Sequence, residues 1–119
     1  MKSCTDIPQS KKLAEILPIK SADMYYWCGE DLRIGGYLAM NTEFDIPCWS
    51  LAALLNTLPV SCDDGDHCLT LINAHPYGEI EWICCYEDSE CDWLYECYAS
   101  NQVDACFELI LKLKEEQLI

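Results

Sequence analysis

Residues 68–98 read CLTLINAHPYGEIEWICCYEDSECDWLYECY, and this stretch decides the fold class. Three runs, 68–74, 80–86 and 93–98, are apolar or alternate between apolar and polar residues, which is typical of β-strands. The segments between them, 75–79 and 87–91, have the length and composition of hairpin loops. The stretch therefore predicts a three-stranded antiparallel meander.

Helices are predicted before and after this meander in the sequence. After it, Asn101 is a suitable N-cap for a helix whose apolar residues recur at helical spacing: Val103, Cys106, Phe107, Ile110 and Leu113. Before it, residues 48–58 place Leu51, Leu54, Leu55 and Leu58 on one helical stripe. Pro47 suits the first turn of that helix and Pro59 suits its end.

The N-terminal third predicts one more helix and two short strands. Thr5 or Ser10 could cap a helix that runs through Ile16 and ends at Pro18. Residues 24–28 and 33–38 read as strands around a polar turn at 29–31, with a bulge or a close backbone approach at the paired glycines. The order α-β-β-α-β-β-β-α predicts an α+β fold, an antiparallel sheet with helices on one face, in a single domain over residues 1–119.

Charge excludes one large class of function. Between residues 34 and 111 the chain has no Lys or Arg and fourteen Asp or Glu, and the whole net charge is −14. Direct nucleic-acid binding needs cationic groups that displace counterions from phosphates, and this stretch has none. A field of this sign attracts basic partners over roughly 8–10 Å at cellular salt.

The cysteines and the N-terminus bear on the cellular compartment. Residues 1–8 lack the apolar segment of a signal peptide, and no apolar run reaches the roughly 18–20 residues of a membrane span. A cytoplasmic protein is therefore expected, with its ten cysteines reduced and packed as small hydrophobes. Disulfides remain the second interpretation.

No residue pattern predicts catalysis, a cofactor or a metal site. Residues 62–68, CDDGDHC, collect metal-ligating side chains, but the chain lacks the short Cys-Cys spacing of zinc knuckles, and Asp-Gly is ordinarily a turn. The two histidines, His67 and His75, lie outside any nucleophile motif. We therefore expect a protein that is not an enzyme.

The aromatic residues are more suggestive. Closing the hairpins at their loops leaves apolar side chains on both faces of the meander: Ile80, Trp82, Cys84 and Tyr86 on one, Ile83, Cys85, Trp93 and Tyr95 on the other. Helices on one face cannot cover both. Either the register differs by one residue, or some aromatics are simply exposed, or the second face meets a partner.

Three segments resemble a group of short uncharacterised proteins of gut bacteria and their phages or mobile elements. They are residues 21–25 (SADMY), 46–51 (IPCWSL) and 103–108 (VDACFE). The resemblance spans most of the chain but implies no activity.

The leading hypothesis is a small acidic protein-interaction module that binds a protein with a basic surface, in one version by mimicking the charge of a nucleic acid. Its predicted contact residues are acidic loop positions and aromatic sheet positions: Asp63, Asp64, Asp66, Glu87, Asp88, Glu90, Asp92, Trp82, Trp93 and Tyr95. A homodimer is left open. The alternative is a metal-binding or redox protein that uses the clustered thiols.

Overall fold

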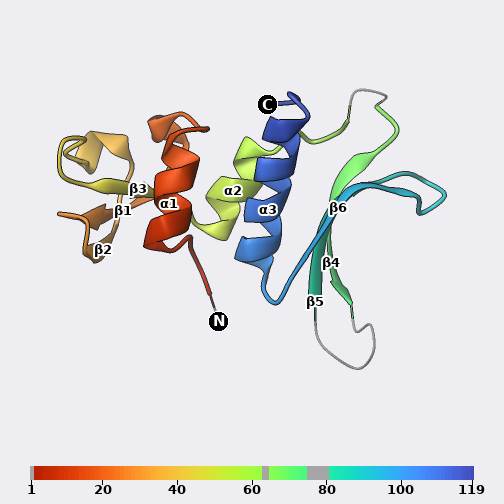
Figure 1. Ribbon diagram of the computed structural model, residues 1–119, viewed down its shortest axis with the longest axis horizontal. Helices are drawn as coiled ribbons and strands as arrows, with labels where there is room; N and C mark the ends of the chain where they lie inside the picture. Colours follow the sequence, from red (N-terminus) through yellow and green to blue (C-terminus); the bar gives the residue numbers. More distant parts are fainter. Residues whose placement is uncertain (1, 63–64, 75–80) are drawn as a thin grey trace. The chain divides into compact units, whose positions relative to one another are not determined.

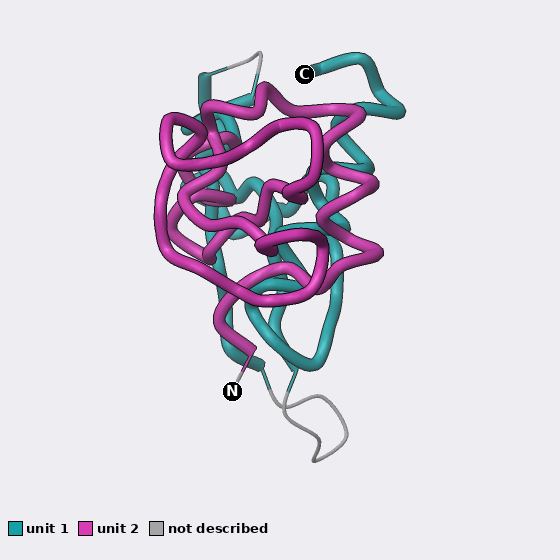
Figure 2. The backbone as a smooth tube through the Cα atoms, turned by 90° about the vertical axis from the view of Figure 1, so that its left-hand side faces the viewer, with its two compact units in different colours: residues 1, 58–119 teal, residues 2–57 magenta. Residues whose placement is uncertain are grey.

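A computed structural model of the chain describes residues 2–62, 65–74 and 81–119 (Figure 1). These residues form two compact units, residues 2–57 and residues 58–119 (Figure 2). Helices and antiparallel strands follow the predicted α-β-β-α-β-β-β-α order, which confirms the α+β class. One short strand is added, and the strands form two three-stranded sheets rather than one. The single domain over residues 1–119 stays a prediction.

The first unit begins with helix α1 (Ile7–Ala14). Neither of the predicted N-caps, Thr5 and Ser10, caps this helix. Asp6 and Gln9 form a capping box instead, in which the Gln9 N–H donates to Asp6 Oδ1 at 2.9 Å and the Asp6 N–H donates to Gln9 Oε1 at 3.1 Å. Thr5 and Ser10 are buried, and their hydroxyls hydrogen-bond to each other at 2.7 Å. These buried hydroxyls therefore do not cap the helix.

The sheet of this unit has the order β2-β1-β3, with β1 (Met24–Trp27) between β2 (Asp31–Ile34) and β3 (Ile46–Cys48). The predicted strand 33–38 is wrong beyond Ile34, because Gly35 has φ +152° and Tyr37–Ala39 is a 3₁₀ helix. A Cβ at Gly35 would lie 3.2 Å from Ala39 Cβ and 3.3 Å from Tyr25 Cε1, so two side chains crowd this position. A second 3₁₀ helix covers Ile19–Ser21.

Helix α2 (Leu51–Thr57) starts later than predicted, and Pro47 is not in its first turn. Residues 46–48 form β3 instead, because they pair with β1 and place Pro47 opposite Tyr25. The Ser50 hydroxyl accepts the Ala53 N–H at 3.2 Å and so caps the helix. Ser50 is itself held by Asp23, whose carboxylate accepts both the Ser50 N–H and the Ser50 hydroxyl. Leu54 and Leu58 of the predicted stripe are buried, whereas Leu51 and Leu55 are half-buried.

The second unit contains the predicted meander, with β4 (Cys68–Ala74), β5 (Glu81–Glu87) and β6 (Trp93–Ala99) in the order β4-β5-β6. Helix α3 (Gln102–Glu115) follows, and its predicted N-cap is confirmed, because Asn101 Oδ1 accepts the Asp104 N–H at 2.9 Å. Four of its five predicted apolar positions are buried, and Phe107 is half-buried. Among the described residues, no helix is both long enough and apolar enough to cross a bilayer.

Candidate functional site

The two faces of the sheet β4-β5-β6 have different surroundings. Helix α3 packs along β5 and β6 on one face (Figure 1), where Cys84 Sγ lies 3.7 Å from Cys106 Sγ. Residues opposite each other in an antiparallel pair share a face, so Trp82, Cys84 and Tyr86 lie on the helix side. No other helix occurs in the described part of this unit, so no helix of the unit itself covers the second face.

This second face is called the outer face from here on. Strand register assigns to it one set of side chains: Cys68, Thr70, Ile72, Ile83, Cys85, Glu87, Trp93 and Tyr98. Tyr98 lies opposite Ile83 and Trp93 lies opposite Glu87. The side chains of Ile83 and Cys85 in the central strand are buried, whereas those of Trp93 and Tyr98 are exposed. The face thus combines exposed aromatic rings with a carboxylate.

A β-bulge in β6 adds a second carboxylate to the outer face. Cys97 pairs with Cys84 but Leu94 pairs with Tyr86, so β6 has one extra residue in this interval. Tyr95 lies there with φ +55°, in the left-handed region. Beyond the bulge the alternation is reversed, so Glu96 lies on the same face as Tyr98, near enough for its charge to raise the pKa of the Tyr98 phenol. Exposed Trp93 and Tyr98 are therefore accompanied by Glu87 and Glu96.

The hairpin between β5 and β6 is acidic and well ordered by its own hydrogen bonds. Asp88 Oδ1 accepts the backbone N–H of Glu90 at 2.9 Å and that of Asp92 at 2.8 Å. The Cys91 N–H donates to the Asp88 carbonyl at 3.1 Å, and Cys91 takes the left-handed conformation at φ +65°. Asp88 is consequently a structural residue of the turn as well as a charge.

The two acidic loops of the sequence meet at the same end of the sheet. Cys68, Glu87 and Trp93 are aligned across the three strands. His67 Nε2 lies 3.7 Å from Asp88 Oδ2, which joins the turn before β4 to the hairpin after β5. Asp66 belongs to that turn, where the Cys62 N–H donates to the His67 carbonyl at 2.9 Å. Asp63, Asp64 and His75 lie outside the described residues.

Nearby carboxylates raise the pKa of two side chains, Cys91 at this end of the sheet and Tyr98 farther along β6. A hydrogen bond to Glu87, the charge of Glu87 and the charges of Asp88 and Asp92 raise the pKa of the exposed Cys91 thiol. Burial and the adjacent Glu96 carboxylate raise the pKa of the Tyr98 phenol. Both shifts disfavour additional negative charge, so the site is suited to a cationic ligand.

The predicted contact residues do not all lie together. Trp93 shares the outer face with Glu87, but Trp82 lies on the helix side, so the two tryptophans face opposite ways. Tyr95 is half-buried within the bulge. Glu96 and Tyr98 were not among the predicted contacts, because strict alternation from Trp93 places them on the helix side. Nothing in the sequence of residues 93–99 indicates the bulge, which places Glu96 and Tyr98 on the outer face instead.

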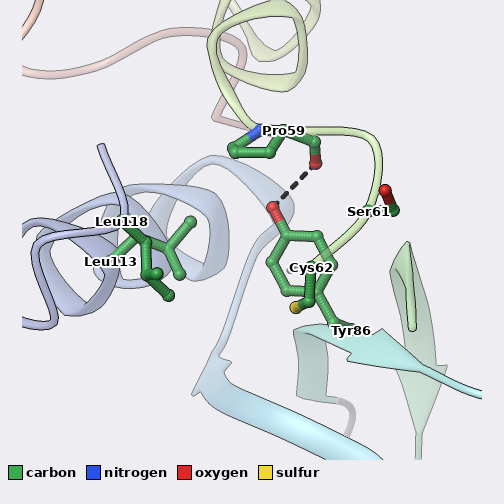
Figure 3. Close-up of a pocket in the computed structure, with 6 residues that line it drawn as sticks. All are labelled: Pro59, Ser61, Cys62, Tyr86, Leu113 and Leu118. Atoms are coloured by element: carbon green, nitrogen blue, oxygen red, sulfur yellow. Dashed lines mark hydrogen bonds between the residues drawn. The ribbon is translucent and has the colours of Figure 1, made fainter. Parts of the chain in front are cut away.

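A small cavity lies on the helix side of the same unit (Figure 3). Its volume is about 130 Å³, and it is lined by Pro59, Ser61, Cys62, Tyr86, Leu113 and Leu118. The Tyr86 hydroxyl donates to the Pro59 carbonyl at 2.8 Å across it. Sites for small metabolites usually enclose at least about 300 Å³. This cavity is too small for such a ligand.

The ten thiols differ in burial, and Cys4, Cys62 and Cys97 are half-buried. Cys48, Cys84, Cys85 and Cys106 are buried, and Cys28, Cys68 and Cys91 are exposed. A hydrogen bond to Cys106 and burial raise the pKa of the Cys84 thiol, which disfavours the reactive thiolate at neutral pH. Within residues 2–62, 65–74 and 81–119, no three or more His, Cys, Asp or Glu side chains are arranged to hold a metal ion. The absence of a metal from the 62–68 segment stays a prediction.

Charge is divided unequally between the two units. Residues 2–57 carry five basic and seven acidic side chains, whereas residues 58–119 carry two basic and fourteen acidic ones. The first unit is therefore nearly neutral, and the second contributes most of the net charge. Comparison with known protein families, curated proteins and solved structures finds no match.

Proposed function

We propose that this protein is a non-enzymatic interaction module whose outer face binds a protein partner with a basic surface. The observation that carries the proposal is the exposure of Trp93 and Tyr98 on a sheet face that also bears Glu87 and Glu96. Aromatic rings attract Lys and Arg side chains through their negative faces, and the carboxylates neutralise the same cations.

Two parts of this surface have different roles in the proposed binding. The hairpin after β5 and the turn before β4 concentrate charge at one end of the sheet and steer a basic partner over several ångströms. The aromatic rings supply contact area once the partner has arrived, and contacts of that kind govern dissociation. A basic groove that normally holds a nucleic acid is one partner of this chemistry. We place the complex in the cytoplasm of a bacterium, in keeping with the resemblance to proteins of bacteria, phages and mobile elements.

Neutralising the charges that steer the partner should slow association without unfolding the protein. The variant is Glu87→Gln with Glu90→Gln and Asp92→Asn, and Asp88 is kept because its carboxylate closes the hairpin. We expect the association rate constant to fall about tenfold at roughly 50 mM salt and the difference to shrink near 200 mM. The measurement is surface plasmon resonance against the partner isolated by affinity capture from host lysate. An association rate insensitive to both changes would overturn the steering role.

Removing an aromatic ring should instead accelerate dissociation. Trp93→Ala should raise the dissociation rate constant at least tenfold, which corresponds to about 1.4 kcal/mol. Leu94→Ala is the matched control, because Leu94 is 37% exposed against 36% for Trp93 and lies on the opposite face. Leu94→Ala should leave dissociation within about threefold of wild type. Equal effects of the two substitutions would show that the outer face is not the binding surface.

A further inference from the structure

The sheet β2-β1-β3 has two edges, and only one of them is blocked by a proline and a covering segment. Edge strands expose unpaired N–H and C=O groups that can recruit another strand, and proteins block them with proline, bulges or covering segments. Pro47 lies on the β3 edge and has no N–H group that could bond to another strand. Beyond β3 the chain is also covered, since the Thr5 N–H donates to the Trp49 carbonyl at 2.9 Å.

The sheet of the other unit is protected as well. At the start of β4 the preceding segment pairs with the strand through a bridge between Ser61 and Cys68, and the Leu69 N–H donates to the Val60 carbonyl at 3.0 Å. The bulge at Tyr95 bends β6. Among the four edges in the described residues, β2 has none of these devices.

Backbone geometry shows which groups of β2 point outward. The Gly35 N–H donates to the Asp23 carbonyl at 3.0 Å, and Gly35 continues the register in which Ile34 is opposite Met24. Hydrogen-bonded and non-bonded pairs alternate along antiparallel strands, so Arg33 and Tyr25 form the next bonded pair. The N–H and C=O groups of Leu32 and Ile34 therefore point away from β1, toward the open edge.

Side chains around this edge are unusually apolar for a protein surface. All four residues of β2 are exposed, and Ile34 is 87% exposed. Leu32 is 45% exposed, and Leu38, four residues after the end of β2, is 89% exposed. Scattered apolar residues need no explanation, but Leu32 and Ile34 are two exposed apolar side chains on one edge strand, at the residues whose backbone groups point outward, which is typical of an interface.

We propose that β2 pairs antiparallel with β2 of a second copy of this chain, about a two-fold axis at Leu32. In this register Leu32 lies opposite Leu32, and Asp31 of each copy lies opposite Arg33 of the other. The strand is thus complementary to itself in charge, which a two-fold interface requires. The outward groups of Leu32 supply the central hydrogen bonds.

Two further observations favour a second copy over another occupant. Residues 2–57 are nearly neutral, so pairing of this unit with its own copy brings together surfaces with little net charge. The Arg33 guanidinium lies 4.6 Å from the centre of the Trp27 ring, on the face that carries Asp31. Arg33 is therefore already oriented on the face where Asp31 of the other copy would lie. This interface is independent of the outer face of the other unit.

A charge exchange tests both the dimer and its register. Sedimentation equilibrium should show a monomer–dimer equilibrium for the wild type. Asp31→Arg alone and Arg33→Asp alone should each raise the dissociation constant at least tenfold, because two attractive pairs become repulsive. The double variant restores complementarity with reversed signs, and its dissociation constant should return to within about threefold of wild type.

Amide hydrogen exchange provides a second measurement that does not depend on any substitution. The Leu32 amide should exchange at least tenfold more slowly at concentrations where the dimer predominates, whereas the Arg33 amide, already bonded to β1, should change much less. A wild type that remains monomeric over the whole accessible range would overturn the proposal. The proposal would also be overturned if neither single substitution changed the dissociation constant of the dimer, or if the double variant failed to restore it.

Discussion

Raising the pH from about 9 to about 11 is expected to remove roughly 2 kcal/mol of stability through each of two buried thiols, one in each unit. Burial raises the pKa of the Cys48 thiol in the first unit to about 11. Burial raises the pKa of the Cys85 thiol in the second unit to about 11 as well. Both side chains are fully buried, so neither is screened by solvent.

The sign follows from where the protons are bound. An unfolded thiol ionises near its ordinary pKa of 9.0, whereas the folded one stays protonated up to about 11. Between these values the unfolded chain holds fewer protons, so each group lowers the free energy of unfolding by about 1.4 kcal/mol per pH unit. The stabilising effect is complete below pH 9. Because whole domains are stable by only about 5–15 kcal/mol, the loss is large.

Urea unfolding in the presence of a reductant measures this effect. The midpoint followed by far-ultraviolet circular dichroism should be nearly constant from pH 7 to 8.5 and should fall steeply between pH 9 and 11. Cys48→Ala and Cys85→Ala each remove one titrating group, so each should make the fall of the midpoint between pH 9 and 11 shallower. A midpoint that is independent of pH between 9 and 11 would contradict the assignment.

Replacing the buried tryptophan of the first unit should be the most damaging single substitution in that unit. Trp49 is fully buried, and its indole N–H donates to Ser21 Oγ at 2.9 Å. Its backbone N–H donates to Thr5 Oγ1 at 3.2 Å, which ties it to the buried hydroxyls before α1. Trp49→Ala should therefore lower the free energy of unfolding by about 3–5 kcal/mol, through lost apolar burial and the cavity that remains.

Two comparison variants separate the contributions to this loss. Trp49→Phe keeps most of the ring volume but leaves the Ser21 hydroxyl without its donor, and it should cost about 1–2 kcal/mol. Trp27→Ala removes a half-exposed ring and should cost no more than about 1 kcal/mol. Urea unfolding gives all three values. A loss for Trp49→Ala no larger than that for Trp27→Ala would contradict the role assigned to Trp49.

Local patterns were sufficient where a segment's own residues determine its structure. Asn101 and the apolar repeat after it predicted α3, because capping and helical periodicity act within a few residues. The meander was predicted because strand runs and polar loops alternate clearly in residues 68–98. The α+β class followed from the order of these elements.

Errors occurred where a distant partner decides the local structure. Pro47 was expected in a helical first turn, but pairing with Tyr25 of β1 makes its segment a strand. Asp23 and Ser50, far apart in the sequence, determine where α2 begins.

The sequence by itself determined the element order, the net charge and its sign, and the surplus of aromatic residues over what helices on one face can cover. Only the tertiary structure decided which residues act together. Strand pairing brings the two acidic loops to one end of a sheet. The bulge at Tyr95 moves Glu96 and Tyr98 onto the outer face because β6 must accommodate one extra residue against β5, a constraint set by the partner strand and invisible in β6 alone.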